Sequence, residues 1–496
     1  MIEAALGGLA MVLSPYALLL LFIGVIYGLI IGFLPGMGGV VAMSLLFPFI
    51  YGMELGPAIC LLWGAHVAVV QGGSISAILF NVPGTSKNIA TCFDGFPMAR
   101  KGEAARALAA SALSSVVGGI AGAIVLTFFI PIMRAIVMSL GAPEYFWMAF
   151  WGLSVIAVFT AGSVFKGLAS AGLGILLAFV GANAITGSSR YSFGIVFLED
   201  GINFAAAVIG LFAIASMIEL YKEGGAIAVK RPTGATGSVL QGMKDVFIHW
   251  GLTFRSSVVG VIIGILPGVG GTVGNILAYG QAVQTERHKK FGTGIVEGVI
   301  APEAAVSANE GGGLVTTLGF GIPSGEGSAI LLMAFIIMGI APGPEMLTKN
   351  LNLVLAMVWI IILANIVGSA VMIALARPLT KLTVMPGSIL IPLVLVVCLV
   401  GAYGINRQMG DVLVALVFGL VGYGMKRFNF SRANLVIGLV MGGMVERYYH
   451  IGLRLYSPEA FFTRPISIFL ILLCVLTIAY PIWRAITMKQ KETMVI

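Results

Sequence analysis

Charged residues are scarce in this chain. Asp, Glu, Lys and Arg make up 10% of the 496 residues, hydrophobic residues make up 59%, and the mean hydropathy is +1.05. Soluble domains carry roughly 25% charged residues, because charged side chains must cover a core that is surrounded by water. This composition excludes a soluble globular protein and indicates an all-α, multi-pass membrane protein, in which apolar runs of about 20 residues each cross the bilayer.

Cysteine and histidine are also rare, with four of each. Cys60, Cys92, Cys398 and Cys474 have no CxxC or metal-ligand spacing, so neither a disulfide framework nor a metal site is predicted. No Walker motif, HExxH or suitably placed GxSxG occurs, and enzyme chemistry is therefore not expected. The net charge of +8 comes from Lys and Arg in short segments between apolar runs, which is typical of cytoplasmic loops and not of nucleic-acid binding.

One short motif occurs twice, 232 residues apart: residues 28–39 read GLIIGFLPGMGG and residues 260–271 read GVIIGILPGVGG. Proline removes a backbone donor and glycine lowers helix propensity, so each apolar helix is predicted to break there. In lipid, such a break is tolerated only where protein or a wet cavity covers the backbone, and paired broken helices mark the binding site of many transporters. The candidate substrate-binding residues of the two breaks are Pro35, Gly36, Gly38, Gly39, Pro267, Gly268, Gly270 and Gly271.

A second repeated motif follows the breaks. QGGS and NVPGTS come after the first break, and GGGL and GIPSG come after the second, at an offset of 240 residues from the first copy. Exposed backbone donors at helix N-termini suit carboxylates, and exposed carbonyls suit a small cation. The alternative is that these glycines only let helices pack closely, as small residues do in membranes. The further substrate-binding candidates are Gly72, Gly73, Ser74, Asn81, Pro83, Gly84, Thr85, Asn309, Gly311, Gly312, Gly313, Pro323, Ser324 and Gly325.

Three ionisable residues lie in or near apolar stretches: His66, Glu303 and Glu310. Such groups are costly in a membrane and are candidates for function. Glu310 directly precedes the Gly311–Gly313 run and is a candidate for binding a coupling cation, together with Asn275 and Thr316. The alternatives are a capping or cytoplasmic-rim carboxylate for Glu310 and a hydrogen-bonded interior histidine for His66.

The flanking charges predict that the two halves have opposite orientations. The second broken run has Arg255 before it and Arg287, Lys289 and Lys290 after it, whereas the first has no basic flank. Arms of about 10–15 residues fit re-entrant hairpins, and five crossings between the hairpins invert the second. This scheme treats 327–341 as non-spanning. The predicted units are a first repeat at 1–220, a cytoplasmic linker at 221–255, a second repeat at 256–450, and a C-terminal span with a basic tail at 451–496.

The motifs GFLPGMGG, QGGSISAILFNVPGT, DGFPMARKGEAARAL, GILPGVGG and the APEAA…NE-GGG…GIPSG run resemble the large membrane subunit of the tripartite tricarboxylate transporter family, from about residue 15 to about 480. The resemblance implies a secondary transporter of the bacterial inner membrane that imports citrate or related carboxylates. It also implies sodium or proton coupling, a small four-span membrane subunit and a periplasmic solute-binding protein. By similarity of design to elevator-type transporters, it suggests that one part moves against the other.

Two other classes of function remain as alternatives. An anion channel would favour an oligomeric pore with rings of charge or carbonyls, which the sequence does not show, and a scaffold would not transport. An intramembrane enzyme would need a catalytic pair at the bilayer midplane, and His66 has no evident partner in the sequence.

Overall fold

The first half of the chain is a series of helices with one small hairpin of strands. A computed structural model describes residues 1–34, 38–160, 164–183, 187–222, 238–268, 270–286, 290–382 and 387–493. The first-half elements are α1 (Ile2–Val12), α2 (Pro15–Phe33), α3 (Gly38–Leu46), η1 (Phe47–Ile50), α4 (Leu55–Phe80), η2 (Ser86–Asn88), α5 (Thr91–Arg100), α6 (Ala104–Ser139), α7 (Ala142–Thr160), α8 (Val164–Ala178), β1 (Gly181–Ala182), β2 (Ser189–Arg190), η3 (Val196–Asp200), α9 (Phe204–Val208), the π-helical turn η4 (Ile209–Ile214) and α10 (Ala215–Lys222).

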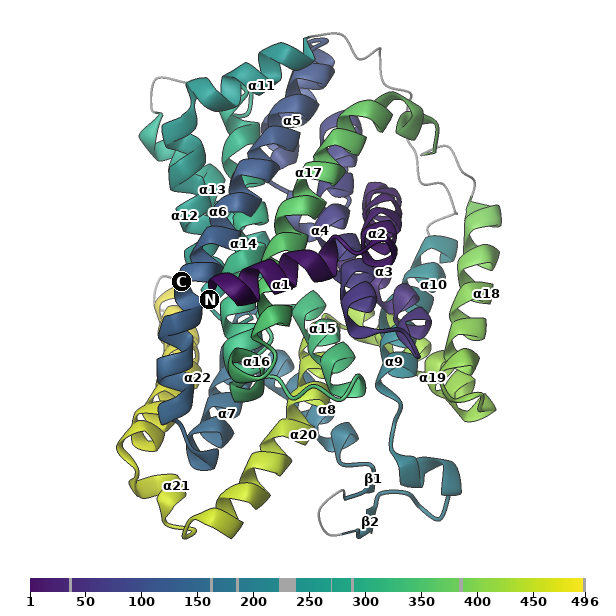
Figure 1. The fold of residues 1–496 in the computed structure, drawn as a ribbon, viewed down its shortest axis with the longest axis vertical. Coiled ribbons are helices and arrows are strands. Elements are labelled where there is room, and N and C mark those ends of the chain that lie inside the picture. The colour runs from purple at the N-terminus through teal and green to yellow at the C-terminus, as the bar shows by residue number, and fades with distance from the viewer. Residues whose placement is uncertain are drawn as a thin grey trace.

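The second half has helices and connecting segments, and no strand, within its described ranges. Its elements are α11 (Val239–Ile248), α12 (Trp250–Ile265), α13 (Gly270–Thr285), α14 (Glu297–Phe320), α15 (Glu326–Ile337), α16 (Pro344–Thr348), α17 (Leu351–Leu382), α18 (Gly387–Asn406), α19 (Met409–Arg427), α20 (Arg432–Leu455), α21 (Ala460–Thr463) and α22 (Pro465–Thr493). In Figure 1, α5 and α11 lie at one end of the long axis, and α21, β1 and β2 lie at the other.

Both predicted helix breaks are confirmed. The first lies between α2 and α3 and the second between α12 and α13. Gly38, Gly268 and Gly270 have φ values of 53°, 70° and 71°, which glycine adopts without steric cost. At 19 residues, α2 is longer than the predicted arm of 10–15 residues and is long enough to cross a bilayer. Its apolar run begins with Pro15 at the first helical turn, whereas α12 starts after a bend of 76° from α11.

Each half contains a tight helix pair that close glycine contacts make possible. α2 packs along α4, and α12 packs along α14. A Cβ on Gly28 would lie 2.3 Å from the carbonyl oxygen of Ala65, and a Cβ on Gly260 would lie 2.0 Å from that of Ala305. These contacts correspond at the repeat offsets of 232 and 240, so the duplication in sequence is also a duplication in packing.

The two halves pack against each other crosswise. α6 of the first half lies against α14, and α17 of the second half lies against α4. α1 of the first half packs on α17 of the second, and correspondingly α11 of the second half packs on α6 of the first. In the same way, α8 packs on α20, and α19 packs on η4. Helices of both halves therefore form the interior together. The opposite orientation of the halves in a membrane remains a prediction.

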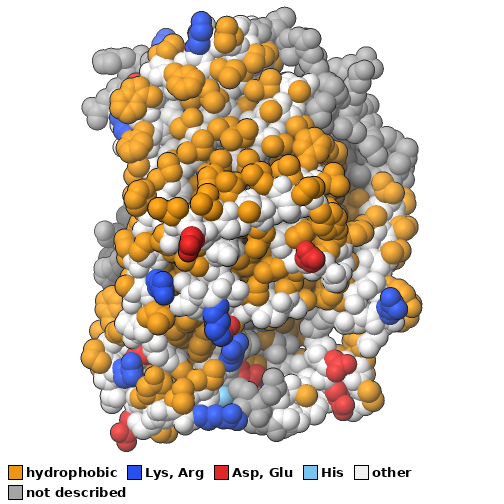
Figure 2. Space-filling model, viewed as in Figure 1, with side chains coloured by type: hydrophobic (Ala, Val, Ile, Leu, Met, Phe, Trp, Pro, Cys, Tyr) orange, Lys and Arg blue, Asp and Glu red, His pale blue; other side chains and the backbone are white. Residues whose placement is uncertain are grey.

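The outer surface fits a lipid environment. Figure 2 shows a broad band of hydrophobic side chains across one face, with most charged side chains below it or at its upper edge. Within the described residues, six helices are long and apolar enough to cross a membrane, or seven if α11 and α12 count as one bent span. α15 has 12 residues, about 18 Å of helix, which is too short for a crossing and supports the non-spanning treatment of 327–341.

The predicted linker at 221–255 contains a helix. α10 ends at Lys222, residues 223–237 lie outside the described residues, and α11 and the start of α12 lie in the remaining part. α11 is held on α6 by an ion pair in which Arg106 Nε lies 2.6 Å from Asp245 Oδ2. The opposite side of α11 exposes Leu240, Phe247 and Ile248.

Candidate functional site

A cavity of about 670 Å³ lies where the two repeats meet. Ligand sites of this type usually measure roughly 300–1,000 Å³. The first residues of α3, α13 and α15 all line it, through Gly38, Gly270 and Glu326. Each of these helices has nine or more residues, and its first backbone N–H groups have no partner within the helix. Three positive helix ends therefore face one cavity.

Two irregular segments, each following a long helix, complete the cavity walls. Tip 1 is residues 81–90, which follow α4, and tip 2 is residues 321–328, which follow α14. Each helix ends on a residue in the left-handed region, Asn81 (φ 57°) and Gly321 (φ 70°). Proline two residues later prevents the helix from resuming at once. The chain therefore turns back toward the break region.

Each tip contacts the broken helix of the opposite half. In tip 1, Ser86 Oγ accepts a hydrogen bond of 2.9 Å from Thr272 Oγ1, and the N–H of Ala90 donates to Asn275 Oδ1 at 2.8 Å. In tip 2, the N-terminus of α15 packs against α3 and lies so close to His66 that a Cβ on Gly327 would be 2.1 Å from the imidazole. The cavity therefore depends on both halves.

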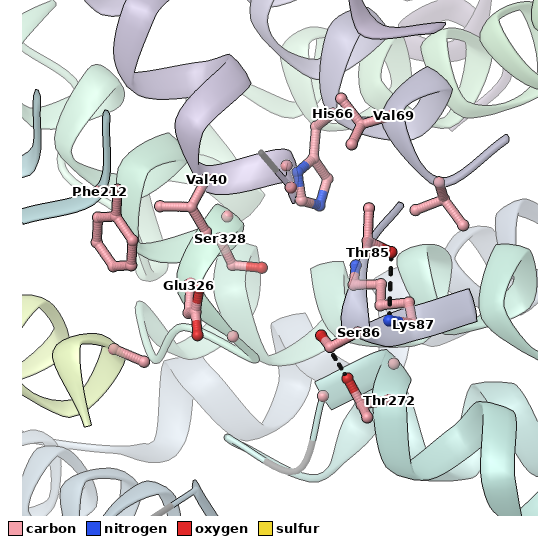
Figure 3. A pocket seen from close by; sticks show the side chains of 18 of the residues that line it. Val40, His66, Val69, Thr85, Ser86, Lys87, Phe212, Thr272, Glu326 and Ser328 are labelled. Atoms are coloured by element: carbon pink, nitrogen blue, oxygen red, sulfur yellow. Dashed lines mark hydrogen bonds between the residues drawn. The ribbon is translucent and has the colours of Figure 1, made fainter. Parts of the chain in front are cut away.

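Glu310 connects a lysine and a histidine at the cavity wall. Its Oε1 lies 2.5 Å from Lys87 Nζ, and its Oε2 lies 3.2 Å from His66 Nε2. His66 is buried and stacks on Trp63, with a distance of 4.6 Å between ring centroids. Figure 3 shows His66, Thr85 and Lys87 on one side of the cavity, Ser86 beside Thr272, and Glu326 and Ser328 across from them. A buried carboxylate with two partners holds Lys87 at the cavity edge.

Further charges reach the cavity from α19 and α20. Lys426 and Arg432 line it, and both pair with Glu219 of α10. Arg432 also lies over the ring of Phe212, 5.4 Å from its centroid. The lining cations Lys87, Lys426 and Arg432 outnumber the lining carboxylates Glu310 and Glu326 by three to two, a difference of one positive charge.

About half of the residues predicted from sequence line this cavity. They are Gly38, Gly39, Pro83, Gly84, Thr85, Gly268, Gly270, Gly271, Asn309, Glu310, Ser324 and Gly325. Pro35 and Gly36 lie outside the described residues. Ser324 takes part in the wall through its backbone as well, because its carbonyl accepts a hydrogen bond of 3.0 Å from the N–H of Gly268.

The other predicted residues lie behind the cavity lining. Several support packing: a Cβ on Gly72, Gly311 or Gly312 would meet backbone of α2, α6 or α12 within 2.4 Å, and one on Gly73 or Gly313 would meet Asn88 or Ser324. Thr316 Oγ1 donates to the carbonyl of Gly313, and Asn275 Oδ1 accepts a hydrogen bond from the N–H of Ala90 in tip 1. The predicted residues outside the lining are Gly72, Gly73, Ser74, Asn81, Pro267, Asn275, Gly311, Gly312, Gly313, Thr316 and Pro323. Their roles in binding stay predictions.

Sequence reasoning did not select Lys87, Thr272, Glu326, Ser328, Lys426 or Arg432 as site residues, although all of them line the cavity. Lys87 is the first basic residue of the chain and lies in a polar stretch, which is typical of a cytoplasmic loop. One available signal was its position directly after NVPGTS, which is the first copy of the second repeated motif. Within the described ranges, no three His, Cys, Asp or Glu side chains gather in a way that could hold a metal ion.

Comparison with known proteins identifies the family. The model of the "Tripartite tricarboxylate transporter TctA family" matches residues 18–437. The chain belongs to the TctA family. It is therefore the large membrane subunit of a tripartite tricarboxylate transporter, and this family transports substrates and is not a family of enzymes. In such systems the large subunit works with a small membrane subunit and a periplasmic binding protein.

Two relatives from Agrobacterium vitis carry no assigned activity. "Uncharacterized 52.8 kDa protein in TAR-I ttuC' 3'region" is 32% identical to this TctA-family chain over 469 residues, covering 93% of this chain and 92% of the relative. "Uncharacterized protein in TAR-II ttuC' 3'region" is 30% identical over 232 residues, covering 45% of this chain and 94% of the relative. No solved structure matches the chain.

Proposed function

We propose that the cavity binds a tricarboxylate such as citrate, or a related carboxylate, and that the chain carries it across the bacterial inner membrane together with a sodium ion or a proton. The periplasmic binding protein delivers the substrate. The observation that carries the proposal is the convergence of three helix N-termini and three cationic side chains on one cavity. Helix N-termini bind carboxylates through free N–H groups and a partial positive charge.

The charge balance of the lining supports co-transport of a cation. The charged side chains of the lining itself sum to one positive charge when His66 is neutral, and Glu219 behind the lining adds a negative charge beside Lys426 and Arg432. A trivalent carboxylate would leave about two negative charges uncompensated in a region of low dielectric constant, where unpaired charge is costly. Cations that enter with the substrate remove this cost, and Glu310 and Glu326 supply carboxylate oxygens beside the substrate for them.

The crosswise construction of the cavity supports alternating access. Tip 1 rests on α13 and tip 2 rests on α3, so each wall includes segments from both repeats. A movement of one part against the other opens the cavity to one side while the other side stays closed. That this movement resembles an elevator is proposed from the paired broken helices alone.

Uptake of labelled citrate tests the proposal. The full chain is reconstituted into liposomes with its small membrane subunit and binding protein, and uptake is measured with an inward sodium gradient, an inward proton gradient, or neither. Gradient-dependent accumulation is expected. The Lys87→Gln variant is expected to raise the KM for citrate at least tenfold, whereas Lys349→Gln, which changes an exposed lysine, leaves it unchanged.

Two results would contradict the proposal. Accumulation of no carboxylate under any gradient excludes coupled transport of this class. Flux that follows only the gradient of the carboxylate itself favours an anion channel.

A further inference from the structure

A second buried carboxylate lies deeper in the molecule than the cavity. Glu303 of α14 is 1% exposed. It lies seven residues before Glu310 on the same helix, roughly 10 Å along its axis and on a similar face. Among the described residues, no Lys, Arg or His lies within 4.0 Å of its carboxylate, whereas the buried carboxylates of Glu310 and Asp245 each have such a partner and that of Asp94 accepts from backbone N–H groups. Glu303 is surrounded by hydroxyl groups instead.

The hydroxyl groups around Glu303 come from three helices. Thr91 Oγ1 of α5 donates to Glu303 Oε1 at 2.6 Å, and Ser74 Oγ of α4 donates to Oε2 at 2.7 Å. Ser115 Oγ of α6 lies 3.4 Å from Oε2. An ionisable residue held in a membrane without a counter-charge is expensive and is a candidate for carrying a proton.

Ser74 can serve both charge states of this carboxyl group. Its Oγ also accepts from Asn88 Nδ2 at 2.9 Å and lies 3.1 Å from the carbonyl oxygen of Val70. A hydroxyl has one donor and two acceptor positions. When Glu303 is ionised, Ser74 donates to it. When a proton binds, the new O–H of Glu303 donates to Ser74 Oγ, and the Ser74 hydroxyl turns to the Val70 carbonyl. Neither state leaves a group without a partner.

A chain of hydrogen bonds connects this carboxyl group to the cavity. Asn88, which donates to Ser74, accepts from Thr85 Oγ1 through its Oδ1 at 2.6 Å. Thr85 lines the cavity, and Lys87, one residue before Asn88, is the partner of Glu310. A substrate that draws Lys87 or Thr85 toward itself therefore shifts Asn88 and changes what Ser74 can offer to Glu303.

The other repeat shows that the fold does not require an acid at this position. The offset of 240 that relates Ala65 to Ala305 in the two helix pairs places Trp63 where the second half has Glu303. Trp63 is also buried. The same helix packing thus accommodates a neutral aromatic side chain, and the carboxyl group needs another explanation.

Other titratable groups near Glu303 are engaged elsewhere. Cys92 is the titratable side chain that faces it from α5. Several charged groups on the elements packed around it have other partners. These are Lys87 with Glu310, Asp94 with the N–H groups of Gly292, Gly294 and Ile295, Arg106 with Asp245, Arg255 with Glu286, and His249 with Glu297.

We infer that Glu303 is the proton-binding site of the transport cycle, and that it binds a proton from water on one side of the membrane and releases it on the other, linked to the cavity through Ser74, Asn88 and Thr85. An O–H bond forms on the carboxylate and breaks again, and no other reactant is consumed. The inference rests on the proposed function and names the proton as the coupling ion.

Infrared difference spectroscopy of the purified full chain between acid and alkaline buffer measures this proton directly. A carboxylic-acid signal is expected that disappears in Glu303→Gln and persists in Glu345→Gln, which changes an exposed carboxylate. Added citrate is expected to shift the pH at which the signal appears, and Ser74→Ala is expected to abolish that shift. A signal unchanged in Glu303→Gln, or an undiminished citrate effect in Ser74→Ala, overturns the assignment.

Transport by the reconstituted complex provides a second test. A pH gradient, alkaline inside, is expected to drive citrate accumulation by the wild type. Glu303→Gln, which resembles the protonated state, is expected to lose the response to the gradient while it still exchanges citrate for citrate. An equal response in Glu303→Gln, or accumulation driven by a sodium gradient alone, contradicts the inference. If the wild type moves no carboxylate, the proposed function fails, whereas the infrared signal still tests whether Glu303 binds a proton.

Discussion

Lys87 and Glu310 form an ion pair of 2.5 Å across the boundary between the two repeats, 223 residues apart in the chain. The side chain of Glu310 is 6% exposed, and that of Lys87 is 23% exposed toward the cavity. His66 approaches the same carboxylate from α4 at 3.2 Å. The pair therefore both connects the repeats and places an ammonium group where a substrate carboxylate can reach it.

Breaking this pair by one substitution is expected to destabilise the protein more than removing both charges. Lys87→Gln leaves the buried Glu310 carboxylate with His66 as its remaining partner, at a cost of about 3 kcal/mol, Glu310→Gln leaves the Lys87 ammonium without its carboxylate, and the double variant leaves neither charge. The free energy of unfolding in detergent micelles, measured for the four proteins of the double-mutant cycle, gives the coupling energy.

The control for this cycle is Lys349 with Glu345, an exposed pair at 3.5 Å whose coupling energy is expected to be small. Strictly additive effects of Lys87→Gln and Glu310→Gln would show that the pair is not coupled.

Glycines at helix crossings and glycines at the cavity are expected to respond differently to alanine. Gly260→Ala places a Cβ 2.0 Å from the Ala305 carbonyl oxygen, so α12 and α14 must separate, at a cost of about 1–3 kcal/mol. Gly271→Ala meets Lys87 side-chain carbons at 3.0 and 3.2 Å, which can move aside. Gly271→Ala is therefore expected to change stability little and to raise the KM for citrate.

Thermal melting and uptake kinetics of both variants separate these effects. If Gly271→Ala lowers the melting temperature as much as Gly260→Ala does, Gly271 acts in packing. If its KM for citrate is unchanged, α13 does not hold the substrate at that residue.

The breaks and tips of the helices were predictable because their cause is local. Proline and glycine disrupt a helix whatever surrounds it, and the repetition of LPGxGG and of the Pro83 and Pro323 turns showed that the disruption is paired. The role of Lys87 was not predictable in this way. A basic residue in a polar stretch looks the same whether the segment stays in water or folds back to the cavity, and its partner Glu310 is set by tertiary packing.

The same limit applies to the glycines and to Arg190. Composition could not distinguish Gly72, which packs against Leu29, from Gly39, which faces the cavity. The Arg190 guanidinium is paired with Glu446 at 2.6 Å. This ion pair compensates its charge, and only the folded structure reveals it.

The predicted orientation of the repeats is tested by labelling single cysteines. Glu54→Cys, after the first broken helix, and Lys290→Cys, after the second, both lie at exposed positions. An impermeant maleimide is expected to reach Glu54→Cys from outside intact cells and Lys290→Cys only from inside. Lys101→Cys is expected to label like Lys290→Cys, because Lys101 donates to the carbonyl of Gly294 nearby.

The four native cysteines are buried, so the background should be low. Labelling of Glu54→Cys and Lys290→Cys from the same face would exclude the inverted arrangement, while the transport proposal would stand.

Relative movement of the repeats is tested by cross-linking Ser86 to Thr272. Their hydroxyl oxygens lie 2.9 Å apart, close enough for paired cysteine sulfurs to form a disulfide with a small adjustment. The Ser86→Cys/Thr272→Cys variant is expected to lose citrate uptake on oxidation and to regain it on reduction, since tip 1 and α13 can no longer separate. Each single cysteine variant is expected to transport in both redox states. If the oxidised double variant still transports at the reduced rate, tip 1 and α13 move together as one body, and alternating access must instead arise at the contact of tip 2 with α3.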